Sequence, residues 1–103
     1  MNLHQFVFMH DSLDQIEHFI IRRIKDIREE KGISQTSLSL AIGKSTSYIS
    51  DIEAQSKTAK YNIKSLNIIA IALGCSIKDF LPDEPIHEEK YNFIKEIEIK
   101  KKS

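Results

Sequence analysis

The fold is decided by one stretch of the sequence, residues 35–53, which reads QTSLSLAIGKSTSYISDIE. Gly43 divides this stretch into two halves, and in each half apolar residues recur at the spacing of an α-helix. A glycine accepts the positive φ that ends a helix, and it lets the next helix leave at a steep angle. The stretch therefore predicts two short helices joined by a tight turn. Their apolar positions are Leu38, Ala41 and Ile42 before the glycine and Ile49 and Ile52 after it.

Polar residues stand where these two helices begin. Ser34 precedes the first helix, where its hydroxyl can accept a hydrogen bond from a free backbone N–H group. Ser45 has the same place before the second helix, which we expect over about residues 46–54. Ile49 and Ile52 share one side of that second helix and are expected to face inward. The opposite side carries Thr46, Ser47, Ser50 and Asp51.

A longer helix precedes the pair. Ser12 and Gln15 have the spacing of a capping box, in which two side chains satisfy N–H groups at a helix start. Apolar residues then recur at helical spacing up to Gly32, which can supply a left-handed end. We expect this first helix to run to about Lys31.

Two further helices are expected after a polar loop at residues 55–62. Asn62 can cap the first of them, which carries an apolar stripe and ends at Gly74. Ser76 and Asp79 form a second capping box, which begins one last helical turn.

Five short helices with brief connections predict a compact all-α domain over residues 12–82. The two ends outside this domain differ from it. In the C-terminal tail, residues 83–103, the run from Ile97 to Lys100 alternates apolar with charged residues, and in the N-terminal arm, residues 1–11, Phe6 and Phe8 alternate around Val7. Such alternation is typical of a half-buried strand, but the tail also fits helical spacing. Short strands and helices therefore both remain open at the ends of the chain, with residues 6–8 and 97–100 as the candidate strands.

Composition indicates a globular domain with tails. Of the 103 residues, 41% are apolar and 29% are charged, values that disfavour the disordered and membrane classes. No apolar run reaches the roughly 18 residues that a membrane span needs, and the start of the chain lacks the features of a signal peptide. We therefore expect a cytoplasmic protein. Because Cys75 is a single cysteine and the four histidines match no familiar metal spacing, we expect no disulfide, no metal and no cofactor.

The net charge is zero, but the charges are unevenly distributed along the chain. Residues 1–19 carry three acidic side chains and no Lys or Arg. Residues 20–82 carry ten basic and six acidic side chains, a net charge of +4. Residues 83–103 carry five basic and six acidic side chains, a net charge of −1. The middle of the chain is therefore modestly basic, although charge alone does not decide the function.

The register of the central stretch resembles that of a known family. In this register the chain is similar to the Cro/repressor (Xre-like) helix-turn-helix family, over about residues 20–81. The residues that carry the resemblance are Gly32 to Gln35, Leu38, Gly43, Ser47 to Ser50, Ile52 and Glu53. It implies a repressor-like DNA-binding domain, whose second helix of the pair enters the major groove.

The resemblance also assigns roles to individual residues. It implies that bases are read by Thr46, Ser47, Tyr48 and Asp51. Phosphate contacts are expected from Gln35, Lys44, Ser50, Lys57 and Lys60. For Gln35 there is a separate reason, because the free N–H groups at a helix start suit a phosphate oxygen.

Four further positions matter for the resemblance. Arg28 and Glu53 occupy places that imply a structural ion pair between the first helix and the end of the recognition helix. The chain departs from the family pattern at Ser39, where alanine is usual, and at Gln55, where glycine often ends the recognition helix. The loop up to Ile63 is also longer than usual.

These observations predict a sequence-specific DNA-binding transcription regulator. The leading hypothesis is a repressor that binds a palindromic operator as a homodimer, with residues 83–103 as a candidate dimerisation segment. The alternative is an antitoxin-like protein-interaction module whose tails bind a partner protein, which the zero net charge and Asp51 slightly favour. We do not expect an enzyme, because no nucleophile with a matched base and no phosphate-binding glycine loop is readable in the sequence.

Overall fold

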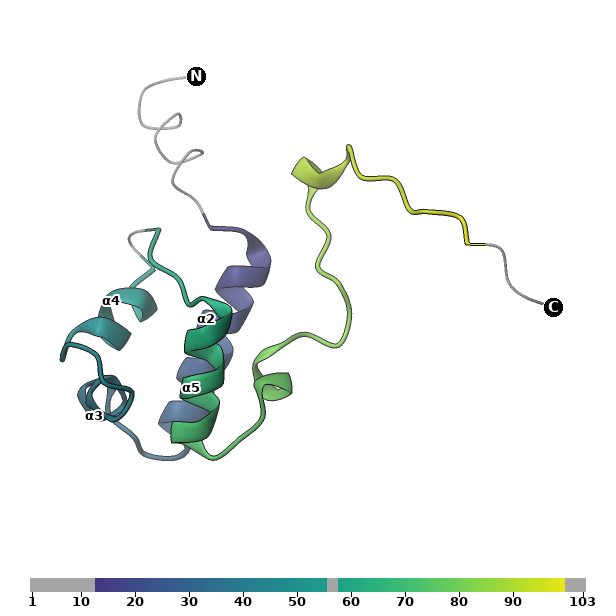
Figure 1. Ribbon diagram of the computed structural model, residues 1–103. Helices are drawn as coiled ribbons and strands as arrows, with labels where there is room; N and C mark the ends of the chain where they lie inside the picture. Colours follow the sequence, from purple (N-terminus) through teal and green to yellow (C-terminus); the bar gives the residue numbers. More distant parts are fainter. Residues whose placement is uncertain (1–12, 56–57, 100–103) are drawn as a thin grey trace, which may run out of the picture.

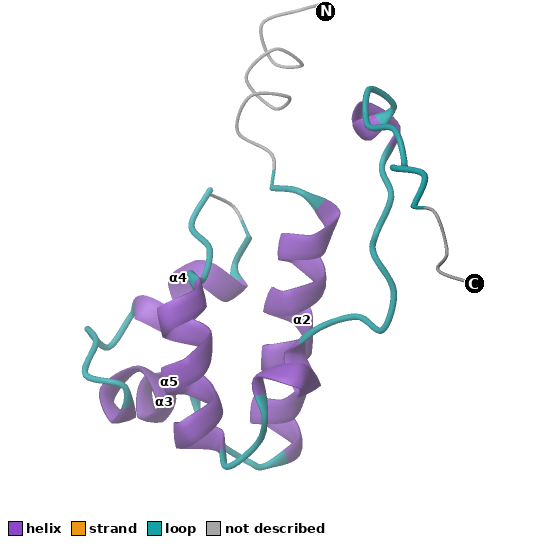
Figure 2. Cartoon of the chain, turned by 45° about the vertical axis from the view of Figure 1, so that its right-hand side comes forward, coloured by secondary structure: helices purple, strands orange, loops and turns teal. Residues whose placement is uncertain are grey.

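Helices account for all the regular structure in the part of the chain that the computed structural model describes, residues 13–55 and 58–99 (Figures 1 and 2). The α-helices are α2 (Gln15–Glu30), α3 (Gln35–Ala41), α4 (Tyr48–Glu53) and α5 (Ile63–Leu73), followed by two 3₁₀ turns, η1 (Ile77–Phe80) and η2 (Glu89–Tyr91). Because these residues contain no strand, the all-α prediction is confirmed.

Two details of the predicted architecture need correction. The last of the five expected helices is the 3₁₀ turn η1, because Pro82 leaves too little chain for a full α-helical turn. The candidate strand at the C-terminal end is not formed within the described residues, where Ile97 and Ile99 are exposed and lie outside any helix or strand. The N-terminal arm, residues 1–11, lies outside the described residues.

The start of α2 differs from the sequence prediction. Its N-cap residue is Asp14, and the Glu17 carboxylate accepts a hydrogen bond from the Asp14 N–H group at 2.9 Å. Gln15 is the first residue of the helix, whereas a capping box needs this side chain at the third position, and Ser12 lies outside the described residues. Two acidic side chains at this end interact favourably with the helix dipole, an advantage that a serine and a glutamine lack.

The caps of α3 and α5 are as predicted, whereas α4 begins later. The Ser34 hydroxyl accepts a hydrogen bond from Ser37 N at 3.0 Å, and the Asn62 side chain accepts one from Ser65 N at 2.8 Å. The N-cap of α4 is Ser47 rather than Ser45. The Ser45 carbonyl instead accepts from Tyr48 N at 3.1 Å, so that a turn precedes the helix.

A cluster of buried apolar side chains joins α2, α3, α4, α5 and η1. It contains Ile24, Ile27, Leu38, Ile49, Leu66, Ile69, Ala70, Leu73 and Phe80. In Figure 1, α3 and α4 lie to one side of α2 and α5. Leu38 and Ile49 in the core hold this pair of helices, which residues 35–53 form, against the other two. Ile21 is also buried, at 1% exposure, although the sequence pattern did not single it out, whereas the predicted core position Ala41 is exposed.

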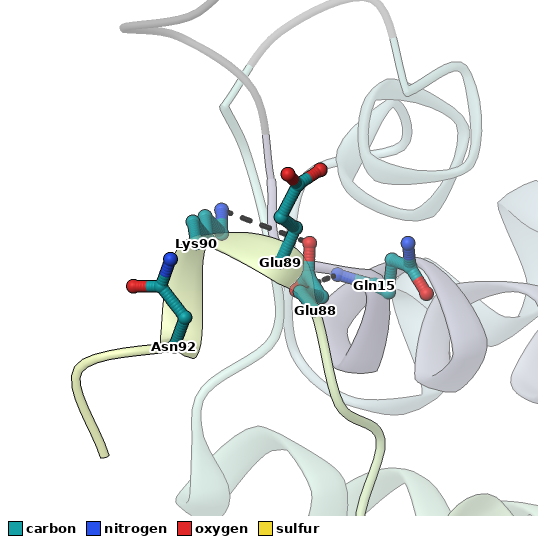
Figure 3. Close-up of a pocket in the computed structure, with 5 residues that line it drawn as sticks. All are labelled: Gln15, Glu88, Glu89, Lys90 and Asn92. Carbon is teal, nitrogen blue, oxygen red and sulfur yellow. Dashed lines mark hydrogen bonds and ion pairs between the residues drawn. The ribbon is translucent and has the colours of Figure 1, made fainter.

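Residues after η1 leave the helical domain and return to it at one place. Among the described residues from 83 to 99 none is buried, and Figure 1 shows this segment running away from the helices. Its 3₁₀ turn η2 contacts the start of α2, where the Glu88 carboxylate accepts from Gln15 N at 2.9 Å (Figure 3). Lys90 Nζ lies 2.5 Å from Asp14 Oδ1, and the Tyr91 hydroxyl donates to the same carboxylate. The tail is therefore attached through polar contacts at the surface.

Candidate nucleic-acid interface

The two sides of α4 differ in exposure. Ile49 and Ile52 anchor the helix in the core, with 0% and 3% of their surface exposed. Thr46, Ser47 and Asp51 are exposed on the other side. We call these three residues the recognition surface. Its short polar side chains lie in the turn before α4 and in its first turn, where no described part of the chain covers them.

Tyr48 faces partly inward and differs from the other predicted base-reading residues. Its hydroxyl lies 3.3 Å from the Ser65 hydroxyl on α5, and its ring centroid lies 6.3 Å from that of Tyr61. The exposed Lys44 places its ammonium group 5.3 Å from the centre of the Tyr48 ring. Tyr48 therefore supports α4 against α5 and steadies Lys44 through a cation–π contact. Base reading by Tyr48 stays a prediction.

Among the predicted phosphate-binding residues, Gln35 and Ser50 make contacts within the domain. The Gln35 side-chain amide donates to Glu53 Oε1 at 3.0 Å, and the Ser50 hydroxyl donates to the Ser47 carbonyl at 3.0 Å. Both residues are half-buried. Their contacts to phosphate stay predictions, and the structure adds a packing role to each.

Of the two lysines predicted to bind phosphate from the loop after α4, the structure describes Lys60. Lys60 Nζ forms an ion pair with Glu17 Oε2 at 2.6 Å, and this contact raises the pKa of the lysine. Because 55% of the Lys60 side chain is exposed, the ammonium group can exchange this partner for another anion. Lys57 lies outside the described residues.

Arg28 and Glu53 form the ion pair that the resemblance implies. Arg28 Nε and Nη2 donate to the two carboxylate oxygens of Glu53 at 2.9 and 2.7 Å, and Nη1 donates to the Ile33 carbonyl at 2.7 Å. Both residues are buried, and the pairing raises the pKa of Arg28. With Gln35, this cluster ties the end of α2, the start of α3 and the end of α4 together.

Two departures from the family pattern have structural explanations. Gln55 follows α4 with a φ of 53°, the left-handed conformation that explains why glycine is usual there. Its side-chain amide oxygen contacts His18 Nδ1 on α2. Ser39 is fully buried between α3 and α4, where its hydroxyl accepts from Ile49 N at 3.0 Å. The sequence signalled Ser39 only as an unusual residue, since its partner lies ten positions away.

The described residues show neither a metal cluster nor a membrane span. None of their helices is long and apolar enough to cross a membrane. They also contain no group of three or more His, Cys, Asp or Glu side chains that could hold a metal ion. The functional feature of the described residues is the pair of helices α3 and α4 with its exposed polar face.

This pair, joined at Gly43 and anchored by apolar residues, defines a helix-turn-helix protein. Residues 24–80 match the family described as helix-turn-helix. The chain therefore belongs to this family, and the Cro/repressor (Xre-like) resemblance is confirmed.

Solved structures agree with this membership. SinR, the master regulator for biofilm formation, has a crystal structure in complex with DNA. The SinR chain in that structure is 34% identical to this chain with a TM-score of 0.52, and the match covers 59% of this chain and 95% of that chain.

Structures of apo-HppE and of CoII HppE in complex with substrate also match, each with a TM-score of 0.57 and 22% identity. These matches cover 66% of this chain and 37% of HppE, and they show a shared fold. No curated protein matches the sequence.

Proposed function

We propose that the chain is a DNA-binding transcription regulator that places α4 in the major groove of double-stranded DNA. One observation carries the proposal: Thr46, Ser47 and Asp51 are exposed together while Ile49 and Ile52 hold the same helix in the core. Family membership supports it, as does the likeness to SinR, which is seen in complex with DNA.

The chemistry of the recognition surface fits base reading. Serine and threonine hydroxyls can donate to or accept from base edges, and a threonine methyl can contact the methyl group of thymine. Asp51 can accept a hydrogen bond from a cytosine amino group. Lys44, exposed beside this surface, supplies a positive charge for the phosphates or for a guanine.

The test begins by selecting bound fragments from a random DNA pool with the full chain. A triple variant, Thr46→Ala/Ser47→Ala/Asp51→Ala, is then compared with a control, Asp26→Ala/Asn67→Ala, which removes the same charge from exposed positions on α2 and α5. Because each good base contact contributes about 1–3 kcal/mol of discrimination, the triple variant should lose at least about tenfold in specific affinity. If it binds the selected DNA as tightly as the control does, α4 does not read the bases.

We further propose that two copies bind a palindromic operator and repress transcription by covering a promoter. A single domain of this kind buries a small interface on DNA, so paired half-sites about 34 Å apart give the affinity that one copy lacks. The candidate dimer segment is the tail, where Phe93, Ile94 and Ile97 are 75%, 61% and 81% exposed. Sedimentation of the full chain and of a variant lacking residues 91–103 tests this. If both proteins sediment with the same number of chains per particle, the tail does not form the dimer interface.

The exposed apolar tail also favours a second candidate function, an antitoxin-like module whose tail binds a partner protein. Salt dependence separates the two candidates. Binding to DNA weakens steeply as salt rises, because each phosphate contact releases a counterion, whereas burial of apolar side chains does not weaken. In either case we propose that the protein acts in the cytoplasm by binding and without catalysis.

A further inference from the structure

Ser39 connects α3 to both ends of the turn that precedes α4. Its carbonyl accepts a hydrogen bond from Lys44 N at 2.9 Å, near the beginning of this turn. Its hydroxyl accepts one from Ile49 N at 3.0 Å, just inside α4, and donates to the Gln35 carbonyl at 2.8 Å. The side chain is fully buried, so no water can take over these roles.

The start of α4 needs such an acceptor. The first N–H groups of a helix have no partner within the helix, and a side chain at the N-cap usually accepts from one of them. The N-cap of α4 is Ser47, whose side chain makes no such bond. Ser39 therefore caps α4 from the preceding helix. An alanine at this position would keep the carbonyl bond to Lys44 and leave the Ile49 N–H group buried without an acceptor.

We propose that Ser39 is a positioning residue that fixes α4 against α3 and thereby sets the sequence preference of the recognition surface. The second half of this inference rests on the proposed function. Thr46 and Ser47 lie between the two N–H groups that Ser39 binds, at Lys44 and Ile49. Losing one of these bonds frees the segment that carries both residues. The hydroxyl of Ser39 therefore acts on the DNA through α4 and does not touch it.

The first test measures hydrogen exchange in the free protein. In Ser39→Ala the Ile49 amide should exchange at least about tenfold faster than in the wild type, while amides at the centre of α5 change less. Ser39→Thr keeps the hydroxyl and should retain slow exchange at Ile49. The control is Ser37→Ala, the same change at an exposed position of α3. Unchanged exchange at Ile49 in Ser39→Ala would overturn the proposal, and this result does not depend on DNA.

The second test uses the selected operator. For Ser39→Ala the ratio of specific to non-specific affinity should fall by about tenfold, while the salt dependence of non-specific binding stays the same. Ser39→Thr and Ser37→Ala should keep the wild-type ratio. If the ratio for Ser39→Ala is unchanged while Ile49 exchanges faster, the hydroxyl holds the helix without setting its preference. If the wild type selects no sequence at all, the proposed function fails, while the exchange test still decides whether Ser39 positions α4.

Discussion

Ion pairs hold both ends of α2, but their surroundings differ. At the C-terminal end the side chains of Arg28 and Glu53 are 8% and 2% exposed, whereas at the N-terminal end those of Lys90 and Asp14 are 49% and 34% exposed. Water replaces a lost partner at the exposed pair and cannot do so at the buried pair. The same chemistry is therefore a fixed part of the fold at one end and a releasable attachment of the tail at the other.

The largest effect should come from breaking the buried pair. Arg28→Ala leaves the Glu53 carboxylate buried without its partner, and we expect the free energy of unfolding to fall by about 3–5 kcal/mol. Chemical denaturation measures this loss. The double variant Arg28→Met/Glu53→Leu removes both charges and should recover much of it, because an apolar pair of similar size needs no partner. An Arg28→Ala variant that melts like the wild type would show that the two ends of α2 do not differ in this way.

Tyr61 tests how costly a buried polar group is when it lacks a partner. Its hydroxyl is buried and has no hydrogen-bond partner among the described residues, and burial raises its pKa well above the usual value. Tyr61→Phe removes this unpaired group and keeps the ring that packs beside Tyr48. We expect the free energy of unfolding to rise by about 1 kcal/mol. A destabilised variant in the same denaturation experiment would mean that the hydroxyl contributes a favourable contact.

Lys60 sharpens the comparison on the exposed side. Its ion pair with Glu17 is exposed to solvent, so Lys60→Gln should leave the denaturation midpoint close to that of the wild type. If Lys60 exchanges Glu17 for a phosphate, the variant should lower the slope of log affinity against log salt by about 1 on DNA. Lys64→Gln, an exposed lysine on α5, is the matched control. If the slope of log affinity against log salt does not change, Lys60 pairs with Glu17 and does not bind phosphate.

The smallest effect is expected for the tail attachment and depends on pH. Hydrogen bonds from Lys90 and Tyr91 hold the pKa of Asp14 below its usual 3.8. A lowered pKa in the folded state means that the contact is fully present above pH 3.8 and is lost as the pH falls through the lowered value. NMR shifts of the Lys90 and Tyr91 amides should report this release.

The same amides in Asp14→Asn provide the control, because this side chain stays neutral over the whole range. Core amides such as that of Ile69, which is fully buried, show whether the domain itself has unfolded. If the amides of the tail shift only together with the core, the tail is not separately releasable.

Local patterns in the sequence predicted the fold well. Helix caps and turns act within a few residues of their own position, so their roles can be inferred from neighbours. Ser34 and Asn62 accept from N–H groups at the starts of α3 and α5, and Gly43 makes the turn after α3. The sequence pattern predicts a start at Ser12 instead of Asp14, because Ser12 with Gln15 and Asp14 with Glu17 have the same capping-box spacing.

Contacts between distant residues account for what could not be predicted of the candidate site. Ser39 binds Ile49, and Gln35 binds Glu53, because α3 and α4 meet at an angle that spacing does not specify. The contact of Asp14 with Lys90 joins residues 76 positions apart. Only the resemblance to a family gave any indication of the Arg28–Glu53 pair, since two charged residues 25 positions apart carry no local signal.

Two contacts hold the loop after α4 against α2. One is the hydrogen bond between Gln55 and His18, and the other is the ion pair between Lys60 and Glu17. Because His18 and Glu17 are consecutive residues, both contacts lie at one place on α2, and the two ends of the loop are held close together. Lengthening the loop between these two contacts would then cost about 0.6 kcal/mol for each doubling of its length. The molecule can therefore accept added residues between α4 and α5 with little loss of folding free energy.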